Sequence, residues 1–458
     1  MKTYKTRLTA ILLAAMMLFS ACGEKTPAPE TDAPETPAVT QTPETETEPE
    51  SEETEPESEE AEAETDAPES ETEPEPETAE PEPEETETEA PETLPDEAEL
   101  LTDPDSDIKE FSDESDTVPV APPETKPAET EAPEVPEETE PERIYSYLNG
   151  YTTTVEERDQ RPVAIMLNNM KKSLPQAGLC EGDIYYECAA EGGITRLMMV
   201  CEDYENLGTV GSIRSSRDYF VDFLANHDAI YVHAGGSNQA YEKISWRGIS
   251  NLDGVNMYLP TTFWRDTWRM NNIGYEHSMM ANGQSIAEGI AFKKYRTELD
   301  ANQVPLFRFY DEETDNTPLG SPASHVHMKS TSINTVDFVY DAETKEYLRY
   351  QYNGMAHTDA TTGEQLSVKN VLILFTQIDL IPGDEAGRLT VGTVGSGQGY
   401  YITNGVRKVV NWSRDSKTST LHLEYRNGDE LILNCGKTFI CVVDDSVASG
   451  IDFEYSWN

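Results

Sequence analysis

The stretch PVAIML, residues 162–167, is a short and continuous apolar run, and it predicts a buried β-strand. Comparable strands are predicted farther along the chain at 183–187 (DIYYE), 194–202 and 228–233 (DAIYVH). Apolar residues recur at helical spacing in three other segments, 215–225, 239–245 and 285–295. Strands that alternate with helices predict a mixed α/β domain over residues 144–300.

The pattern changes after residue 300. Residues 301–330 are loop-rich and read as a linker, and short alternating segments bounded by turn residues then follow one another closely. Asn427-Gly428-Asp429 lies between two such segments and predicts a hairpin, because Asn-Gly suits the turns that match strand twist. We therefore expect a mostly antiparallel β domain over residues 331–458.

A glycine-rich run, GSGQGYYITNG at 395–405, lies inside this β region. It contains no lysine and no helix is predicted after it, so a phosphate-binding loop is disfavoured. Turns and a β-bulge are the expected structure.

Residues 22–143 form a segment of different composition, made of repeated Glu, Thr, Pro and Ala. The whole chain has a formal net charge of −55, of which about −44 belongs to this segment and about −14 to the residues after it. Such a segment buries too little apolar surface to fold, and its prolines and like charges favour an extended chain. We expect a disordered spacer; a calcium-binding or O-glycosylated stalk is a secondary alternative.

The first 21 residues have the charged and apolar regions of a signal peptide, with Lys2, Lys5 and Arg7 ahead of an apolar run. Residues 18–22, Leu-Phe-Ser-Ala-Cys, resemble a lipobox in which Cys22 receives a diacylglyceryl group, although Phe19 stands where Leu is usual. Two acyl chains would hold the protein on the membrane, whereas one chain gives marginal binding. We expect an extracytoplasmic, lipid-anchored protein that reaches into the cell wall; secretion without lipid is the alternative.

Five cysteines follow Cys22, and none has the spacing of a metal or redox motif. Buried small side chains are the simpler interpretation of Cys180, Cys188, Cys201, Cys435 and Cys441. Export would also permit a disulfide between Cys435 and Cys441 or between Cys180 and Cys188. No basic patch indicates nucleic acid, and no motif indicates a cofactor.

Several longer motifs occur in the order found in one bacterial family. They are RPVAIMLNN at 161–169, AEGGITR at 190–196, GSIRSSRDYF at 211–220, DAIYVHAGGS at 228–237, FWRD at 263–266, and GSGQGYYITNG at 395–405 followed by Trp412. With these motifs the region from Arg161 to Val443 resembles the YerB-like lipoproteins. The resemblance implies two domains and an extracytoplasmic location, and it implies no mechanism.

Charged residues gather near the predicted strand ends of the α/β domain. Glu187 and Glu191 precede Gly192-Gly193, and strand ends beside glycines are common ligand sites. Arg196, Arg214, Ser215 and Arg217 would form a cradle for an anion or carboxylate. The structural alternative is that Ser215 or Ser216 caps a helix while the arginines pair with Glu187, Glu191, Asp218 or Asp222.

Other candidates are weaker. His233 precedes a Gly-Gly turn and would suit a general base, although structural histidines are commoner. Arg265, Asp266 and His277 lie in an aromatic stretch that would suit sugar rings or peptide side chains, or would cover the core.

Two further patterns suggest catalysis or metal binding only loosely. Ser215, His233 and Asp266 supply the residue types of a triad, but no nucleophile-elbow motif surrounds the serine. His325 and His327 would share one face of a strand, but no third metal ligand is evident, so no metal site is predicted.

These patterns lead to a primary hypothesis and two alternatives. The primary one is a binding or scaffolding lipoprotein of the cell envelope that recognises an anionic or glycan-like ligand through Arg196, Arg214 and Arg217, with a cell-wall polymer or an envelope protein as its partner. The first alternative is a wall-active hydrolase with Glu187 or Glu191 as general acid or base. The second uses the β domain as a docking surface for another envelope protein.

Overall fold

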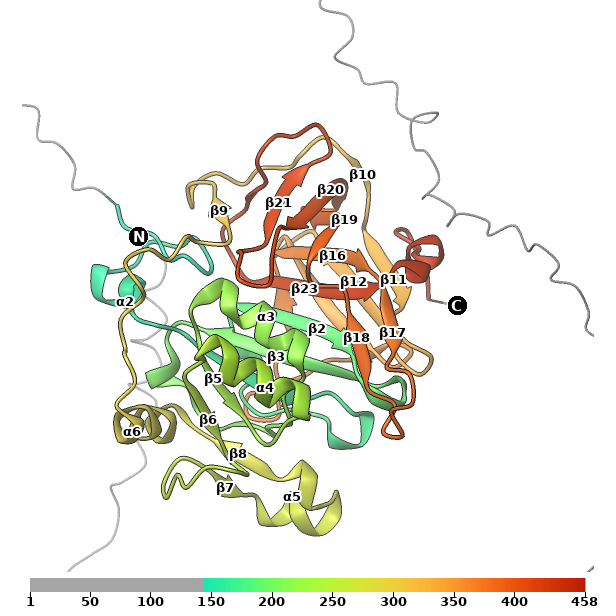
Figure 1. Cartoon of the computed structure of the whole chain (residues 1–458). Coiled ribbons are helices and arrows are strands. Elements are labelled where there is room, and N and C mark those ends of the chain that lie inside the picture. Colours follow the sequence, from blue (N-terminus) through green and yellow to red (C-terminus); the bar gives the residue numbers. More distant parts are fainter. Residues whose placement is uncertain (1–142, 458) are drawn as a thin grey trace, which may run out of the picture. The chain divides into compact units, whose positions relative to one another are not determined.

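The computed structural model describes residues 143–457 (Figure 1). The predicted signal peptide, Cys22 and almost all of the acidic spacer lie outside the described residues. Among residues 143–457, no helix has the length and apolar character needed to cross a membrane.

An eleven-stranded sheet is the centre of the described region. Ten of its strands follow one path, and the eleventh, β21 (His422–Tyr425), pairs with β20. The order along the path is β10 (Ser321–Pro322), β20 (Val406–Arg414), β19 (Gly395–Thr403), β16 (Asn370–Thr376), β23 (Thr438–Asp444), β2 (Ile184–Ala189), β3 (Thr195–Cys201), β1 (Val163–Asn168), β5 (Ile230–His233) and β6 (Asn251–Asp253).

The sheet is mixed. β1, β5 and β6 are parallel to one another, and β23 is parallel to both of its neighbours, β2 and β16. β3 runs antiparallel to both β1 and β2. Because β2 and β23 are adjacent, strands from both predicted domains share one sheet; the expected domain boundaries stay a prediction.

Smaller sheets and five helices complete the fold, and they confirm the expected mixed α/β class with many antiparallel strands. A second sheet contains β11 (His325–Lys329), β12 (Thr335–Asp341), β13 (Glu346–Gln351), β14 (Met355–Ala356) and β15 (Ser367–Val368). The remaining strands form three small sheets: β4 (Val210–Gly211) with β8 (Met279–Ala281) and β7 (Trp264–Arg265); β17 (Ile378–Leu380) with β18 (Leu389–Val391); and β22 (Ile432–Leu433) with β9 (Arg308–Phe309). The helices are α2 (Val155–Asp159), α3 (Asp218–Leu224), α4 (Asn238–Arg247), α5 (Thr267–Asn272) and α6 (Gly283–Lys293).

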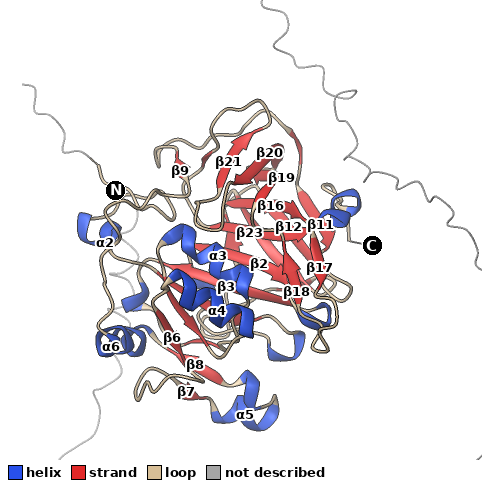
Figure 2. Cartoon of the chain, in the orientation of Figure 1, coloured by secondary structure: helices blue, strands red, loops and turns tan. Residues whose placement is uncertain are grey.

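Helices α3 and α4 cover one face of the large sheet (Figure 2). Six consecutive residues of α3, from Tyr219 to Leu224, are buried, and the Phe223 ring stacks on Tyr186 of β2 with centroids 5.2 Å apart. α4 begins at a Ser237 cap, whose hydroxyl accepts the Ala240 N–H at 3.2 Å. Apolar contact and capping thus agree on where these helices lie.

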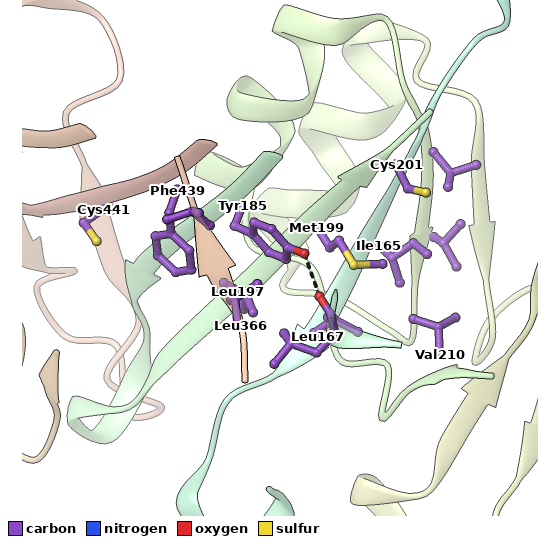
Figure 3. Packing of buried hydrophobic residues seen from close by; sticks show 14 of the residues in the cluster. Ile165, Leu167, Tyr185, Leu197, Met199, Cys201, Val210, Leu366, Phe439 and Cys441 are labelled. Atoms are coloured by element: carbon purple, nitrogen blue, oxygen red, sulfur yellow. Dashed lines mark hydrogen bonds between the residues drawn. The ribbon is translucent and has the colours of Figure 1, made fainter. Parts of the chain in front are cut away.

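The opposite face packs against the second sheet and α6 (Figure 3). Tyr185 and Tyr186 are neighbours on β2, so their rings enter the two different cores, as strand alternation requires. Tyr185 stacks on Phe439 of β23 with centroids 5.7 Å apart, and its hydroxyl donates to the Leu179 carbonyl at 2.6 Å. Burying each such ring contributes about 1.5–3 kcal/mol.

The glycine-rich run departs from its expected bulge. Residues 395–403 pair one for one with residues 414–406, which makes β19 an uninterrupted strand with a turn at Asn404-Gly405. A Cβ on Gly397 would lie 2.5 Å from the Trp412 indole nitrogen, and one on Gly399 would lie 2.4 Å from the Ile373 carbonyl oxygen. The glycines therefore permit close packing within a regular strand; the bulge prediction was wrong and the turn prediction was right.

The Asn-Gly turn at 427–429 is present, with the Tyr425 N–H donating to the Asp429 carbonyl at 2.8 Å. Pairing beyond it is limited to one bridge between Glu424 and Glu430. All five described cysteines are free thiols, and all but Cys180 are buried.

A buried polar network connects the two sheets around Glu187 of β2. Arg349 of β13 donates its Nη2 to Glu187 Oε2, and the two residues are 0% and 3% exposed. Thr195 and Asn169 donate to the other carboxylate oxygen at 2.6 and 3.0 Å. His357 lies 2.5 Å from the Arg349 Nη1, and burial with the Arg349 charge lowers the pKa of His357 well below its usual range.

Replacing Arg349 tests the structural weight of this pair. Arg349→Met should lower the free energy of unfolding by about 3–5 kcal/mol, because Glu187 keeps a buried charge without its partner. Urea denaturation followed by circular dichroism measures the change. Arg388→Met is the control: the Arg388–Asp384 pair is partly solvent-exposed and should contribute about 1 kcal/mol or less. Equal effects of the two variants would contradict the assignment.

Candidate functional site

The candidate site lies at one edge of the large sheet, where β1, β5 and β6 end and β3 begins. Because β1, β5 and β6 are parallel, their carboxyl ends meet at this edge, the usual ligand position in open α/β sheets. Arg196, near the start of β3, is paired with Asn168, the last residue of β1. The segment 212–217 passes alongside, with the Arg214 N–H donating to the Met166 carbonyl at 2.9 Å.

Two arginines and one glutamate form the inner part of the site. Glu191 lies just after β2 and accepts two hydrogen bonds from Arg217, one of them from Nη2 at 2.8 Å. Arg196 is 4% exposed; it donates Nη1 to the Ser215 carbonyl at 2.5 Å, and its Nη2 lies 4.0 Å from Glu191. One carboxylate therefore serves two guanidinium groups.

The outer part of the site is open to solvent. Arg214 donates to the Glu276 carbonyl at 2.7 Å, and the Glu276 carboxylate lies 3.8 Å from the Lys172 ammonium. Arg265 donates to the Tyr275 carbonyl at 2.6 Å and lies over the Tyr275 ring at 3.9 Å from its centroid. The Lys172 and Glu276 side chains are 52% and 54% exposed, so a ligand can reach this part.

We call Lys172, Arg196, Arg214, Arg217 and Arg265 the cation cluster. Two carboxylates, Glu191 and Glu276, lie among these five cations. The cluster is therefore positive, within a folded region whose total charge is about −14.

The pKa shifts in the cluster record this excess of positive charge. Burial, followed by the charges of Arg217 and Arg214, lowers the pKa of Arg196 to about 9. Burial and Arg217 also lower the pKa of Arg214, against the opposing effect of Glu276. Burial alone would raise the pKa of Glu191, but hydrogen bonding and charge from Arg217 outweigh it and lower that pKa. An anion bound here would relieve the repulsion among the arginines.

Two of the predicted ligand residues have local structural contacts. Asp266 caps α5, accepting the Arg269 N–H at 2.7 Å. Ser215 contributes its carbonyl to Arg196. The expected caps of α3 were wrong: its N-cap is Arg217, without a side-chain cap, and the Ser216 hydroxyl instead accepts the Tyr231 hydroxyl at 2.8 Å.

The catalytic candidates are enclosed by other residues. Glu187 is in the buried network with Arg349, and not with Arg214 or Arg217. His233 is fully buried, with ring nitrogens 2.8 Å from the Gly235 carbonyl and 3.2 Å from Asn251. Burial lowers the pKa of His233, although Asp253 opposes the shift. The described contacts do not join Ser215, His233 and Asp266 into a triad.

The His325 and His327 pair has a protein partner. Both rings contact Asp337 Oδ1, at 3.1 and 2.6 Å, and Tyr455 stacks on His327 with centroids 4.1 Å apart. Within residues 143–457, no group of three or more His, Cys, Asp or Glu side chains has an arrangement that would hold a metal ion.

Sequence reasoning missed two members of the outer part and the main partner of Glu187. Lys172 and Glu276 come from segments about 40 and 60 residues away from Arg214 along the chain, and no local pattern connects them. Arg349 carries a signal in hindsight, because it lies among apolar and aromatic residues on an alternating strand, EYLRYQ.

Comparison with known proteins gives a consistent result. Two family models match the chain, the N-terminal domain of a protein of unknown function (DUF3048) at residues 148–296 and the C-terminal domain of the same family at residues 325–440. Over 309 residues, 68% of this chain and 89% of the relative, the sequence is 27% identical to a Bacillus subtilis (strain 168) protein with the name "Putative lipoprotein YerB".

A solved structure supports the fold. The crystal structure of the YerB protein from Bacillus subtilis matches with a TM-score of 0.57 and 25% sequence identity, over 68% of this chain and 99% of that chain. All five residues of the cation cluster lie within the stretch matched by the N-terminal model.

The pairing of Glu191 with Arg217 predicts a pH dependence. The folded pKa of Glu191 is lowered, so the pair stabilises the protein above the ordinary glutamate pKa of about 4.3, and this contribution is lost as the pH falls through the folded value. Glu191→Gln should therefore cost about 1.5–3 kcal/mol at pH 7 and progressively less toward pH 3. Chemical denaturation at stepped pH values measures it.

The matched control is Glu205→Gln, at an exposed carboxylate, which should change stability by about 0.5 kcal/mol or less at either pH. A Glu191→Gln cost that is equally large at pH 3 and pH 7 would count against an ionised Glu191–Arg217 pair.

Proposed function

Since the chain belongs to the DUF3048 family, for which no function is known, we propose one from the geometry: an extracytoplasmic lipoprotein that binds an anionic, glycan-like ligand of the cell envelope through its cation cluster. The excess of five cations over two carboxylates at the carboxyl edge of the sheet carries this proposal.

The chemistry of the site favours an anion with several oxygens. Guanidinium groups bind carboxylate and phosphate through paired hydrogen bonds, and Arg214 and Arg265 each use one printed hydrogen bond on a backbone carbonyl. Arg196 and Arg217 are largely buried and act mainly through their charge. In a protein that is acidic elsewhere, this local positive potential would direct an anion to the cluster.

The alternative of a wall-active hydrolase has less support. A general acid needs a raised pKa, whereas Glu191 has a lowered one, and Glu187 is enclosed by the Arg349 network. Scaffolding by the β domain has no particular surface feature in its favour.

The name of the Bacillus subtilis relative supports a lipid anchor. We propose that Cys22 carries a diacylglyceryl group with an added fatty acid such as palmitate, and that the acidic spacer lets the folded region reach into the cell wall. The ligand would then be a wall polymer or another envelope component.

A binding assay tests the cation cluster. At about 50 mM salt the full-length chain should co-sediment with purified cell-wall sacculi, and Arg214→Gln with Arg265→Gln should reduce the bound fraction about tenfold, because two solvent-reachable charges are lost. The melting temperature should change little, since both arginines bond only to carbonyls at the surface. The control Lys329→Gln with Lys417→Gln removes the same charge at exposed positions outside the cluster. If both double variants bind as well as the parent chain, the cluster is not the binding site.

A second experiment tests the anchor. In the native bacterium the parent chain should fractionate with membranes, and Cys22→Ser should release it to the soluble exterior fraction, because the thiol that would be acylated is gone. Mass spectrometry of the N-terminal peptide should find a diacylated cysteine. A membrane-bound Cys22→Ser chain, or an unmodified Cys22, would refute the lipid anchor.

A further inference from the structure

Exposed aromatic side chains lie in the same segment as the outer part of the cation cluster. Trp264 of β7, Trp268 of α5 and Tyr275 are 37%, 64% and 62% exposed. Large aromatic side chains usually dominate cores, so several exposed rings in fewer than about 15 residues mark a surface for interaction. The elements that carry them, β7 and α5, lie together beside β8 in Figure 1.

Tyr275 is joined to the cluster by direct contacts. Its ring lies against the Arg265 guanidinium, its carbonyl accepts from Arg265, and the next residue, Glu276, accepts from Arg214. A group held by Arg214 and Arg265 would therefore lie beside the Tyr275 ring.

Trp268 belongs to the same surface through α5. The next residue, Arg269, donates Nη1 to the Ser173 carbonyl at 2.9 Å, which fixes α5 next to the turn that carries Lys172. Trp268 is thus exposed on a helix attached to the cluster and is free of a core role. These two rings, from Trp268 and Tyr275, are called the aromatic rim.

We propose that the ligand is an anionic saccharide, whose acidic group binds the cation cluster and whose sugar ring packs on the aromatic rim. This inference rests on the proposed function and specifies its ligand class. A flat aromatic face offers apolar contact to the C–H face of a sugar ring, while the adjacent arginines bind its carboxylate or phosphate. A bare anion would use the arginines and leave the rim without a role.

Charge separates this ligand from a membrane surface, which aromatic and cationic side chains can also bind. The folded region carries about −14 and the spacer about −44, and an anionic bilayer would repel both. Glu276 lies within the outer part and adds to that repulsion. A soluble anionic saccharide is small enough to meet the local cations without meeting the remaining acidic surface.

Isothermal titration of the full-length chain tests the ligand class with four probes: tetragalacturonate, neutral maltotetraose, inorganic phosphate and phosphatidylglycerol vesicles. We expect tetragalacturonate to bind more tightly than phosphate or maltotetraose. Trp268→Ala and Tyr275→Ala should each weaken tetragalacturonate by about tenfold, the effect of losing one stacking contact, and leave phosphate unchanged. Tyr275→Phe retains the ring and should bind as the parent chain does. Trp246→Ala is the control, because Trp246 is 60% exposed on α4 and outside the rim.

The outcomes separate this inference from the proposed function. If phosphate binds and is lost in Arg214→Gln, but the rim variants change tetragalacturonate affinity by less than about twofold, the saccharide assignment is overturned and the anion site stands. Equal binding of maltotetraose, or preferential binding to the vesicles, also overturns it. Failure of both phosphate and tetragalacturonate to bind overturns the anion site itself.

Discussion

The buried pair of Glu187 and Arg349 is the constraint on which the arrangement of the molecule depends. Two charges with almost no solvent contact are stable only when they are paired and hydrogen-bonded, and here the partners come from different sheets. The second sheet must therefore stay against the large sheet at this point. The stacked rings of Tyr185 and Phe439 and the surrounding apolar side chains supply the favourable burial around it.

This constraint extends to the surface site through a short stretch of backbone. Thr195 donates to Glu187 and is followed directly by Arg196, while Thr331, just after β11, donates to the Gly193 carbonyl at 2.5 Å. The loop that carries Glu191 and the start of β3 is therefore held from both sides. Arginines that repel one another can be kept in place in this way, ready for an anion, because their positions are set by the buried network below them.

The sequence predicts the regular parts of this structure well and the site only in part. Continuous apolar runs such as 162–167 and the alternating segments after residue 330 indicate their strands, since local pattern reflects burial. Arg349 escapes such reasoning: alternation on β13 suggests that Leu348 faces inward, yet Tyr347, Arg349 and Gln351 are the buried residues. Arg196, Arg214, Arg217 and Arg265 were predicted as ligand residues, whereas Lys172 and Glu276 join them only through tertiary contacts.

The central claim is that the cation cluster is a preformed anion site, and anomalous scattering tests it most directly. Crystals of the full-length chain soaked in a low concentration of selenate, with selenium as the anomalous scatterer, would show where an oxyanion binds first. The account predicts the strongest peak within hydrogen-bond distance of Arg214 and Arg265, with the side chains placed as they are without selenate. A strongest peak elsewhere on the surface, with no density at these arginines, would contradict it.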